Sequence, residues 1–277
     1  MDGNRGHDLD DLVDAEGVLL PSHRFDYGGQ CWWCGQAADS GEHKYKRTDL
    51  VREFGTGPWK NAVARVVSEK PRDVQSPGAT GLKFSKVLCG NCNSARSQKF
   101  DRAYDIFSSY IVQEQERILS ESGFRWSQIF GSEWRNGRNL VSAYWLKHIG
   151  CRFADGGVEV DPKISIYLND PGQIRSVPLR MELQIQEDLE ALTRHFQSHS
   201  QDFPSLWIGD LLCLYSRSRQ RIRQATSHWG LRWLRLTYQF DLDYSRANIN
   251  FWKDKVPLPR FSNVDPRSVI ENCHLCR

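Results

Sequence analysis

The chain has 277 residues, 39% of them hydrophobic and 26% charged, and a formal net charge of +3. This composition is typical of a globular protein with one large domain or two smaller ones. The sequence contains no run of about 18 apolar residues and no apolar N-terminal segment, which argues against a membrane-spanning helix and a signal peptide. We therefore expect a cytoplasmic protein that does not act in a membrane.

Residues 1–27 are polar and acidic without periodicity, which predicts a loose N-terminal arm. In the next part, 28–122, local signals predict several short elements. These are a strand at Gly41–Lys46, a helical turn at Thr48–Arg52 with Thr48 as N-cap, a strand within Asn61–Ser68 and a loop at Pro71–Gly81.

From Asn93 onward, apolar residues recur every three or four positions toward Ile118. This period predicts one long amphipathic helix whose aromatic stripe packs in the core. For 123–277 we expect a mixed α/β region, so the fold class of the whole chain is α+β. The expected elements there are a helix at Asn139–Cys151, strands at Leu206–Tyr215 and Leu231–Phe240, and a run at Arg180–His195 that fits either a strand or a helix.

The eight cysteines include two CxxC pairs, Cys31-Trp-Trp-Cys34 and Cys89-Gly-Asn-Cys92. In a reducing compartment, two such pairs favour a tetrahedral zinc site over disulfides. We predict a structural zinc ion bound by Cys31, Cys34, Cys89 and Cys92. The 54 residues between the pairs exceed the usual zinc-ribbon spacing, so the loop that the metal would close contains something further.

Cys273 and Cys276 form one more pair of the same spacing. No fourth pair accompanies it, so a second zinc ion would need Cys151 or Cys213 as well. Whether these cysteines bind a metal stays open.

Positive charge is concentrated around the two cysteine pairs. From Gly41 to Ala103 there are 13 Lys or Arg residues against six Asp or Glu residues. A polyanionic partner, usually nucleic acid, would explain this surplus, and a solvated face is the alternative.

Three side chains near the cysteine pairs suit the hydrolysis of a phosphodiester. Glu42 and Asn93 offer hard oxygen ligands for Mg²⁺ or Mn²⁺, which would polarise the scissile phosphate. His43 would deprotonate the attacking water, because the pKa of an imidazole lies near neutrality. Two structural alternatives are an exposed polar pair at Glu42-His43 and a helix N-cap at Asn93.

Three motifs together resemble the CxxC-framed branch of the HNH endonucleases. They are Cys31-x-x-Cys34, Glu42-His43 and Leu88-Cys89-x-x-Cys92-Asn93-x-x-Arg96-Ser97-Gln98. The similarity covers residues 28–105. It extends to a group of bacterial and phage HNH proteins of unassigned biology. Restriction, phage defence, mobility and packaging are all open as biological roles. It implies a ββα-metal fold, a hairpin and one helix around a single metal ion, and a nucleic-acid substrate, most often DNA. It further implies Glu42 and Asn93 as metal ligands, His43 as general base and Arg96 as a phosphate contact, with Lys44 and Lys46 as further candidate substrate contacts.

The chain departs from the HNH pattern at one position. The Asn that orients the catalytic His usually lies five residues before the third cysteine, where this chain has Phe84. A backbone carbonyl or a neighbour such as Ser85 would have to orient His43 instead. The departure leaves two other functions open: a zinc-stabilised nucleic-acid-binding module without activity, and a purely structural zinc domain that joins proteins.

Four arginines alternate with other residues at Arg217, Arg219, Arg221 and Arg223, and no acidic residue interrupts 211–240. On a strand, a period of two places all four on one face, where they would follow a phosphate backbone. They are therefore candidate substrate contacts, with a solvated strand or a turn as the alternative. Any protein partner or second copy of the chain is expected to bind through this C-terminal region.

Overall fold

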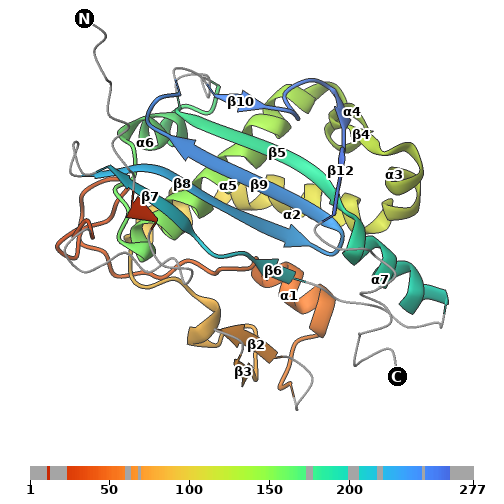
Figure 1. Cartoon of the computed structure of the whole chain (residues 1–277), viewed down its shortest axis with the longest axis horizontal. Helices are drawn as coiled ribbons and strands as arrows, with labels where there is room; N and C mark the ends of the chain where they lie inside the picture. The colour runs from red at the N-terminus through yellow and green to blue at the C-terminus, as the bar shows by residue number, and fades with distance from the viewer. Residues whose placement is uncertain are drawn as a thin grey trace, which may run out of the picture.

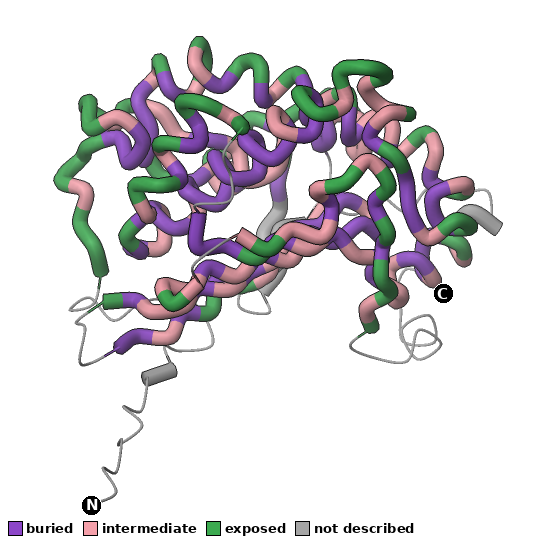
Figure 2. Tube along the Cα trace, turned by 90° about the horizontal axis from the view of Figure 1, so that it is seen from above, coloured by how far each residue is buried: buried purple, intermediate pink, exposed green. Residues whose placement is uncertain are grey.

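The structure is a computed structural model, and it describes residues 11–12, 24–59, 64–67, 70–172, 177–198, 206–216, 221–244 and 247–262. The described residues form a mixed α+β fold, as the sequence predicts. An eight-stranded sheet makes one layer, and helices packed behind it make the other (Figure 1). Seen from above, these packed helices lie on one side of the sheet (Figure 2).

The strands of the large sheet are β1 (Asp11–Leu12), β5 (Leu179–Gln186), β6 (Leu206–Ile208), β7 (Leu212–Ser216), β8 (Arg221–Leu231), β9 (Leu234–Asp241), β10 (Asn248–Ile249) and β12 (Arg260–Phe261). The main path runs in the order β1-β7-β8-β9-β5-β10. Its long ladders, β8 with β9 and β9 with β5, are antiparallel. β6 pairs with β8, whereas β10 and β12 pair with β5 in parallel.

The helical layer consists of α2 (Gln98–Gln113), α3 (Gln115–Glu121), α4 (Trp126–Phe130), α5 (Trp134–Gly156) and α6 (Pro162–Asn169), and α7 (Glu187–Ser198) follows β5 directly. The long helix α5 is buried over most of its length. Tyr104 of α2 stacks on Tyr144 of α5, with ring centroids 3.9 Å apart, and meets Trp229 of β8 edge-on. These rings join the two layers. A second small sheet pairs β4 (Gly123–Arg125) with β11 (Lys255–Pro257).

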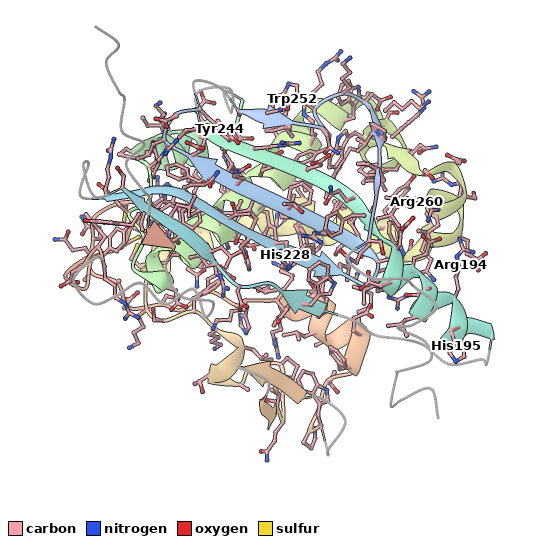
Figure 3. The ribbon with its side chains drawn as sticks, in the orientation of Figure 1. Arg194, His195, His228, Tyr244, Trp252 and Arg260 are labelled. Atoms are coloured by element: carbon pink, nitrogen blue, oxygen red, sulfur yellow. The ribbon has the colours of Figure 1, made fainter. Side chains whose placement is uncertain are left out.

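Alternation along the strands gives the large sheet one apolar and one polar face. Tyr238 of β9 is buried and packs on Phe153 of α5. Arg235, three positions earlier, points to the opposite face and donates to Gln186 of β5 at 2.9 Å. His228 lies near Arg235, on the sheet face turned toward the viewer (Figure 3).

The segment between the two cysteine pairs folds as an insertion at the edge of the molecule. It contains α1 (Arg47–Phe54), the hairpin of β2 (Ala64–Val67) and β3 (Lys70–Asp73), and a 3₁₀ turn at Thr80–Leu82. The insertion has a small core of its own, against which β6 packs, made of Leu50, Trp59, Val74 and Leu82. The loop closed by the cysteines thus contains a folded unit.

One large core crosses the domain boundary predicted at residue 122. It extends from Trp33 in the first cysteine pair through Phe100 of α2 to Trp229 and Phe240 in the sheet. The parts 28–122 and 123–277 therefore share their main core, and their division into domains stays a prediction. Among the residues described, no helix has the length and apolarity needed to cross a membrane.

The helical predictions need three corrections. The single long helix expected after Asn93 is instead a π-helical turn (Cys92–Arg96) followed by α2 and α3, with interruptions at Ser97 and Glu114. Thr48 is not an N-cap, because α1 already begins at Arg47 and the Thr48 hydroxyl donates to Asp105 of α2. The helix predicted at Asn139–Cys151 extends in both directions as α5.

Strand boundaries also differ from those predicted. The ambiguous run at Arg180–His195 is a strand and then a helix, β5 and α7, and Leu206–Tyr215 is divided between β6 and β7. The first residues of the predicted loop Pro71–Gly81 belong to β3, and the expected strand within Asn61–Ser68 is observed as β2. Asp11 and Leu12 of the predicted loose arm pair with β7, and the arm's other residues up to 23 lie outside the described chain. Pairing partners far along the chain decide these boundaries.

Candidate functional site

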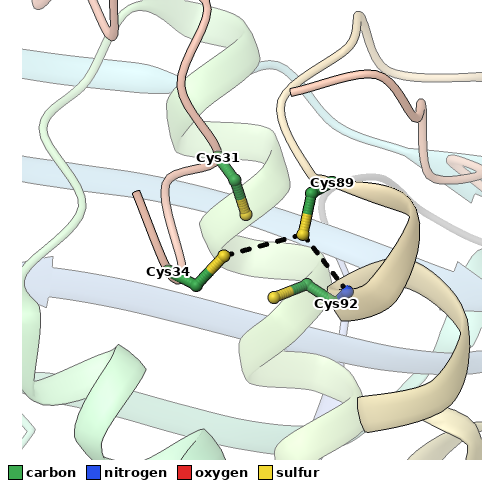
Figure 4. A group of neighbouring side chains, drawn as sticks. All are labelled: Cys31, Cys34, Cys89 and Cys92. Carbon is green, nitrogen blue, oxygen red and sulfur yellow. Dashed lines mark hydrogen bonds between the residues drawn. The ribbon is translucent and has the colours of Figure 1, made fainter. Parts of the chain in front are cut away.

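The two cysteine pairs come together in space (Figure 4). The sulfur atoms of Cys31, Cys34, Cys89 and Cys92 lie within 4.8 Å of one another, and those of Cys34 and Cys89 are 3.6 Å apart. In a tetrahedral site with Zn–S bonds of about 2.3 Å, the sulfur atoms are roughly 3.8 Å apart. The four cysteines are therefore able to hold a metal ion such as zinc. We call them the cysteine cluster.

Tight backbone turns shape both halves of the cysteine cluster. After the first pair, the N–H of Gly35 donates to the carbonyl of Cys31 at 2.8 Å, and Gly35 has a φ of 75°, which favours glycine. In the second pair, the N–H of Cys92 donates to the Sγ of Cys89, 3.4 Å away, as the chain enters the π-helical turn. Both turns direct two sulfurs toward one point.

The charge environment of the cysteine cluster favours a bound cation. Burial raises the pKa of Cys92 well above its usual range, and the neighbouring Cys34 and Cys31 raise it further. Four adjacent thiolates repel one another, so a cation at their centre is what allows all four to ionise. Arg96 adds a positive charge from outside, because its Nη1 donates to the Sγ of Cys92 at 3.2 Å.

Glu42 and His43 lie on a segment that pairs in antiparallel fashion with the residues before the second cysteine pair. The N–H of Phe84 donates to the carbonyl of Glu42, and the N–H of Lys44 donates to that of Leu82, both at 2.8 Å. The regular strand that the sequence predicts here is reduced to isolated bridges. The segment is held in place by these few backbone bonds.

A side-chain hydrogen bond ties this paired segment to the helical turn after the second cysteine pair. The Nδ2 of Asn93 donates to the Oγ of Ser40 at 2.8 Å. Asn93 lies inside the π-helical turn and does not cap it, contrary to the alternative interpretation. Its Oδ1 is buried and has no hydrogen-bond partner among the described residues. Such an oxygen costs about 1–3 kcal/mol if it stays unpaired, so it is suited to accept a donor or a cation.

Glu42 is 8% exposed, and its carboxylate is held at both oxygens. Oε1 accepts the N–H of His43 at 2.9 Å, and Oε2 lies 2.6 Å from the Nζ of Lys147 in α5. Lys147 also lies 3.3 Å from the carboxylate of Asp101 in α2. An internal ammonium group therefore already neutralises the predicted metal ligand Glu42.

The His43 side chain is partly buried, and its Nε2 has no hydrogen-bond partner among the described residues. Burial lowers the pKa of the imidazole, Lys83 and Arg47 lower it further, and Glu42 and a hydrogen bond with the Pro77 backbone raise it. The lowered pKa favours the neutral form of the ring, which is the form that accepts a proton.

Three predicted substrate contacts near this segment have partners within the protein. Arg96 lies over the indole ring of Trp33, 4.5 Å from its centroid, in addition to its bond to the cysteine cluster. Lys46 forms an ion pair with Asp101 at 2.9 Å. Lys44 lies 5.6 Å from the centroid of the Phe84 ring. Their charges are partly compensated without nucleic acid.

Arg47 and Lys83 are the basic residues near His43 that are best suited to contact a phosphate group. Neither forms an ion pair within the part of the chain that the structure describes, and both act on the charge of His43. Lys83 is the direct cross-strand partner of His43. The sequence placed both in the basic segment but did not distinguish them from its other Lys and Arg residues.

The predicted row of C-terminal arginines is only partly observable. Arg217 and Arg219 lie outside the described residues. Arg221 and Arg223 lie in β8 on the face opposite to the buried Ile222, as the predicted alternation requires, and the register between β7 and β8 shifts directly after Arg223. Arg223 also forms an ion pair with Asp243 at 3.0 Å.

The other predicted metal ligands are not brought together among the described residues. Cys273 and Cys276 lie outside the described part. Cys151 and Cys213 are both buried, and burial raises the pKa of Cys213 to about 12. Within the described ranges, the cysteine cluster is the one group of three or more Cys, His, Asp or Glu side chains arranged for a metal ion.

Sequence reasoning missed Lys147 and Asp101, which lie at the centre of the buried ion pairs. Lys147 follows Tyr144 by three positions on the helical stripe of α5 that includes Ala143 and Leu140, where a core residue is expected. A lysine at such a position is the only signal that the sequence offers, because charged side chains are almost never buried without a partner.

Comparison of the chain with models of known protein families, with curated proteins and with solved structures finds no match.

Proposed function

We propose that this chain is a metal-dependent endonuclease of the HNH type that hydrolyses phosphodiester bonds in DNA. The observation that carries the proposal is the link between Ser40 and Asn93. It fastens the segment of Glu42 and His43 to the first turn of the helix that follows the second cysteine pair. An antiparallel pair of segments followed by such a helix is consistent with the ββα arrangement that the sequence resemblance implies.

The proposed roles follow from the chemistry of the three side chains. The neutral ring of His43 would take the proton of the attacking water. The carboxylate of Glu42 and the unpaired Oδ1 of Asn93 would bind the divalent ion. A Mg²⁺ or Mn²⁺ ion bound there supplies Lewis-acid polarisation of the phosphate and stabilises the leaving oxygen. Arg47 and Lys83, beside His43, would attract the phosphate backbone.

In the same proposal the cysteine cluster binds one structural zinc ion. Backbone turns position its four sulfurs, and Cys92 begins the π-helical turn that contains Asn93, so a bound ion would fix the start of that turn. Elemental analysis of the purified protein is expected to find one zinc per chain. A content clearly below one would contradict this part of the proposal.

Cleavage of plasmid DNA in Mg²⁺ or Mn²⁺ tests the proposed activity. His43→Ala is expected to slow cleavage by about 10²–10⁴, because it removes the general base, while DNA binding and zinc content persist. His195→Ala, which changes a histidine on α7, is the matched control and should cleave like the wild type. Equal rates for His43→Ala and the wild type would refute the mechanism.

A second function is favoured by one observation, the ion pair of Lys147 with Glu42. If this pair keeps the divalent ion out permanently, the chain is a zinc-stabilised module that binds nucleic acid without cutting it. DNA binding with no cleavage in any divalent metal, and no effect of His43→Ala, would identify this alternative.

A further inference from the structure

Lys147 is a buried cation at the place where the proposed mechanism needs a divalent one. Its side chain is 1% exposed, on the long helix α5. Its Nζ lies 2.6 Å from the Oε2 of Glu42, 3.3 Å from the Oδ1 of Asp101 and 3.3 Å from the Oγ of Ser97. An ammonium group has three N–H donors, so these three acceptors use all of them. Lys147 therefore has no donor left for a phosphate.

The surrounding charges are nearly balanced without a metal ion. Asp101 is shared between Lys147 and Lys46, and Lys46 also lies 3.9 Å from Asp105. The group thus contains three carboxylates, from Glu42, Asp101 and Asp105, and two ammonium groups, which leaves one net negative charge. A buried charge is stable only when it is paired, and here the pairing is internal.

This charge balance opposes the binding of a divalent ion at Glu42. The ion would bring two positive charges next to the ammonium group of Lys147, and the low dielectric of a buried site strengthens their repulsion. The remaining candidate ligand, Asn93, is a neutral amide and contributes no negative charge. Phosphate oxygens of a bound nucleic acid would contribute the negative charge that the protein lacks.

We propose that Lys147 keeps Glu42 from binding a divalent ion in the free protein, so that the ion binds only together with the phosphate backbone of a nucleic acid. Lys147 is a positioning residue in this account: it fixes the Glu42 carboxylate and lowers its affinity for the ion. The inference rests on the proposed function, because it concerns the same site.

The test is a titration of the zinc-loaded protein with Mn²⁺, with bound and free Mn²⁺ separated by electron paramagnetic resonance. The His43→Ala protein, which should not cleave, is titrated with and without a short DNA duplex, and the duplex alone is subtracted. The affinity for Mn²⁺ is expected to be at least about tenfold higher with the duplex than without it. Glu42→Gln should abolish this increase.

Variants of Lys147 test whether its charge is what weakens Mn²⁺ binding by the free protein. Without DNA, Lys147→Met is expected to bind Mn²⁺ about tenfold more tightly than the wild type, because it removes the opposing charge. Lys147→Arg keeps the charge and should behave like the wild type. Lys99→Met removes an exposed lysine of α2 and is the matched control for a change in net charge.

Two results would overturn the inference. One is tight Mn²⁺ binding by the free wild-type protein that DNA does not improve, and the other is an unchanged affinity in a folded, zinc-loaded Lys147→Met variant. Should that variant not fold, the titration of the wild type with and without the duplex decides the question, because tight Mn²⁺ binding without DNA would still overturn the inference. Cleavage assays run in parallel keep the two proposals apart. A gain of Mn²⁺ binding without any cleavage supports the role of Lys147 and contradicts the nuclease, whereas cleavage without the DNA-dependent gain contradicts the role of Lys147.

Discussion

The guanidinium group of Arg96 contacts both cysteine pairs, through Cys92 of the second pair and through Trp33, which lies between the two cysteines of the first pair. Its Nη1 donates to the Sγ of Cys92 at 3.2 Å, while its plane lies over the indole ring of Trp33. Arg96 lies one helical turn after Cys92, at the end of the π-helical turn. It therefore joins the two halves of the cluster from one side, which makes it a supporting residue of the cysteine cluster.

Arg96→Ala is expected to weaken zinc retention. Removing a partner that bonds to a metal ligand typically costs about 10–100-fold in metal affinity, and here a compensating charge is lost as well. Zinc release to a colorimetric chelator should therefore be faster by about tenfold or more. Arg102→Ala, an exposed arginine of the adjoining α2, should release zinc at the wild-type rate. Identical rates for Arg96→Ala and the wild type would contradict the supporting role.

The pH profile of cleavage should reflect the environment of His43. Burial, with Lys83 and Arg47, lowers the pKa of its imidazole, so the neutral base persists below the usual value of about 6.5. The maximal rate is expected to be constant at neutral pH and to fall only in acid. Replacing both Arg47 and Lys83 by Gln removes two positive charges, so the acid limb should move to higher pH. Lys86→Gln, an exposed lysine on the same segment, should leave the limb in place.

The stability of the protein should fall with decreasing pH because of His148. Burial lowers the pKa of this histidine to about 4, and its Nε2 contacts the carbonyl of Lys44 at 2.8 Å. Between pH 6.5 and 4 the unfolded chain binds a proton that the folded chain does not, so the free energy of unfolding drops as the pH falls through this window, by up to about 3 kcal/mol.

Urea unfolding at a series of pH values measures this dependence. His148→Gln should flatten the slope between pH 6.5 and 4, though not abolish it, because burial also lowers the pKa of His228 to about 4. A slope in His148→Gln as steep as in the wild type would show that His148 does not cause the effect.

Gly150→Ala should destabilise the packing of α5 against the first cysteine pair. A Cβ atom at this position would lie 2.4 Å from the Trp32 ring, which other core residues hold in place. Overpacking of this kind costs about 1–3 kcal/mol, more than the gain in helix propensity from replacing glycine. Gly172→Ala, where a Cβ meets no atom within 4 Å, is the control. An unchanged midpoint of thermal unfolding in Gly150→Ala would contradict the close packing.

Part of the site was predictable because it depends on short spacings in the sequence. A CxxC turn brings two sulfurs together whatever surrounds it, so Cys31, Cys34, Cys89 and Cys92 were found as one group. Likewise, the mixed α+β fold and the approximate places of α5 and β9 follow from periodicity. The joining of Glu42, His43 and Asn93 in one site, and any catalysis there, stays a prediction from the resemblance.

Other features arise only from contacts between residues distant in the sequence. Lys147 meets Glu42 across more than a hundred positions, and no local pattern specifies such a pair. The same holds for the register shift beside Arg223, which depends on the pairing of β7 with β8. The sequence by itself determined that the four cysteines could bind a metal ion and approximately where α5 and β9 would form, since both depend on near neighbours. Only the tertiary structure decided which charges are compensated inside the protein, because burial and ion pairing depend on the packing of the whole chain.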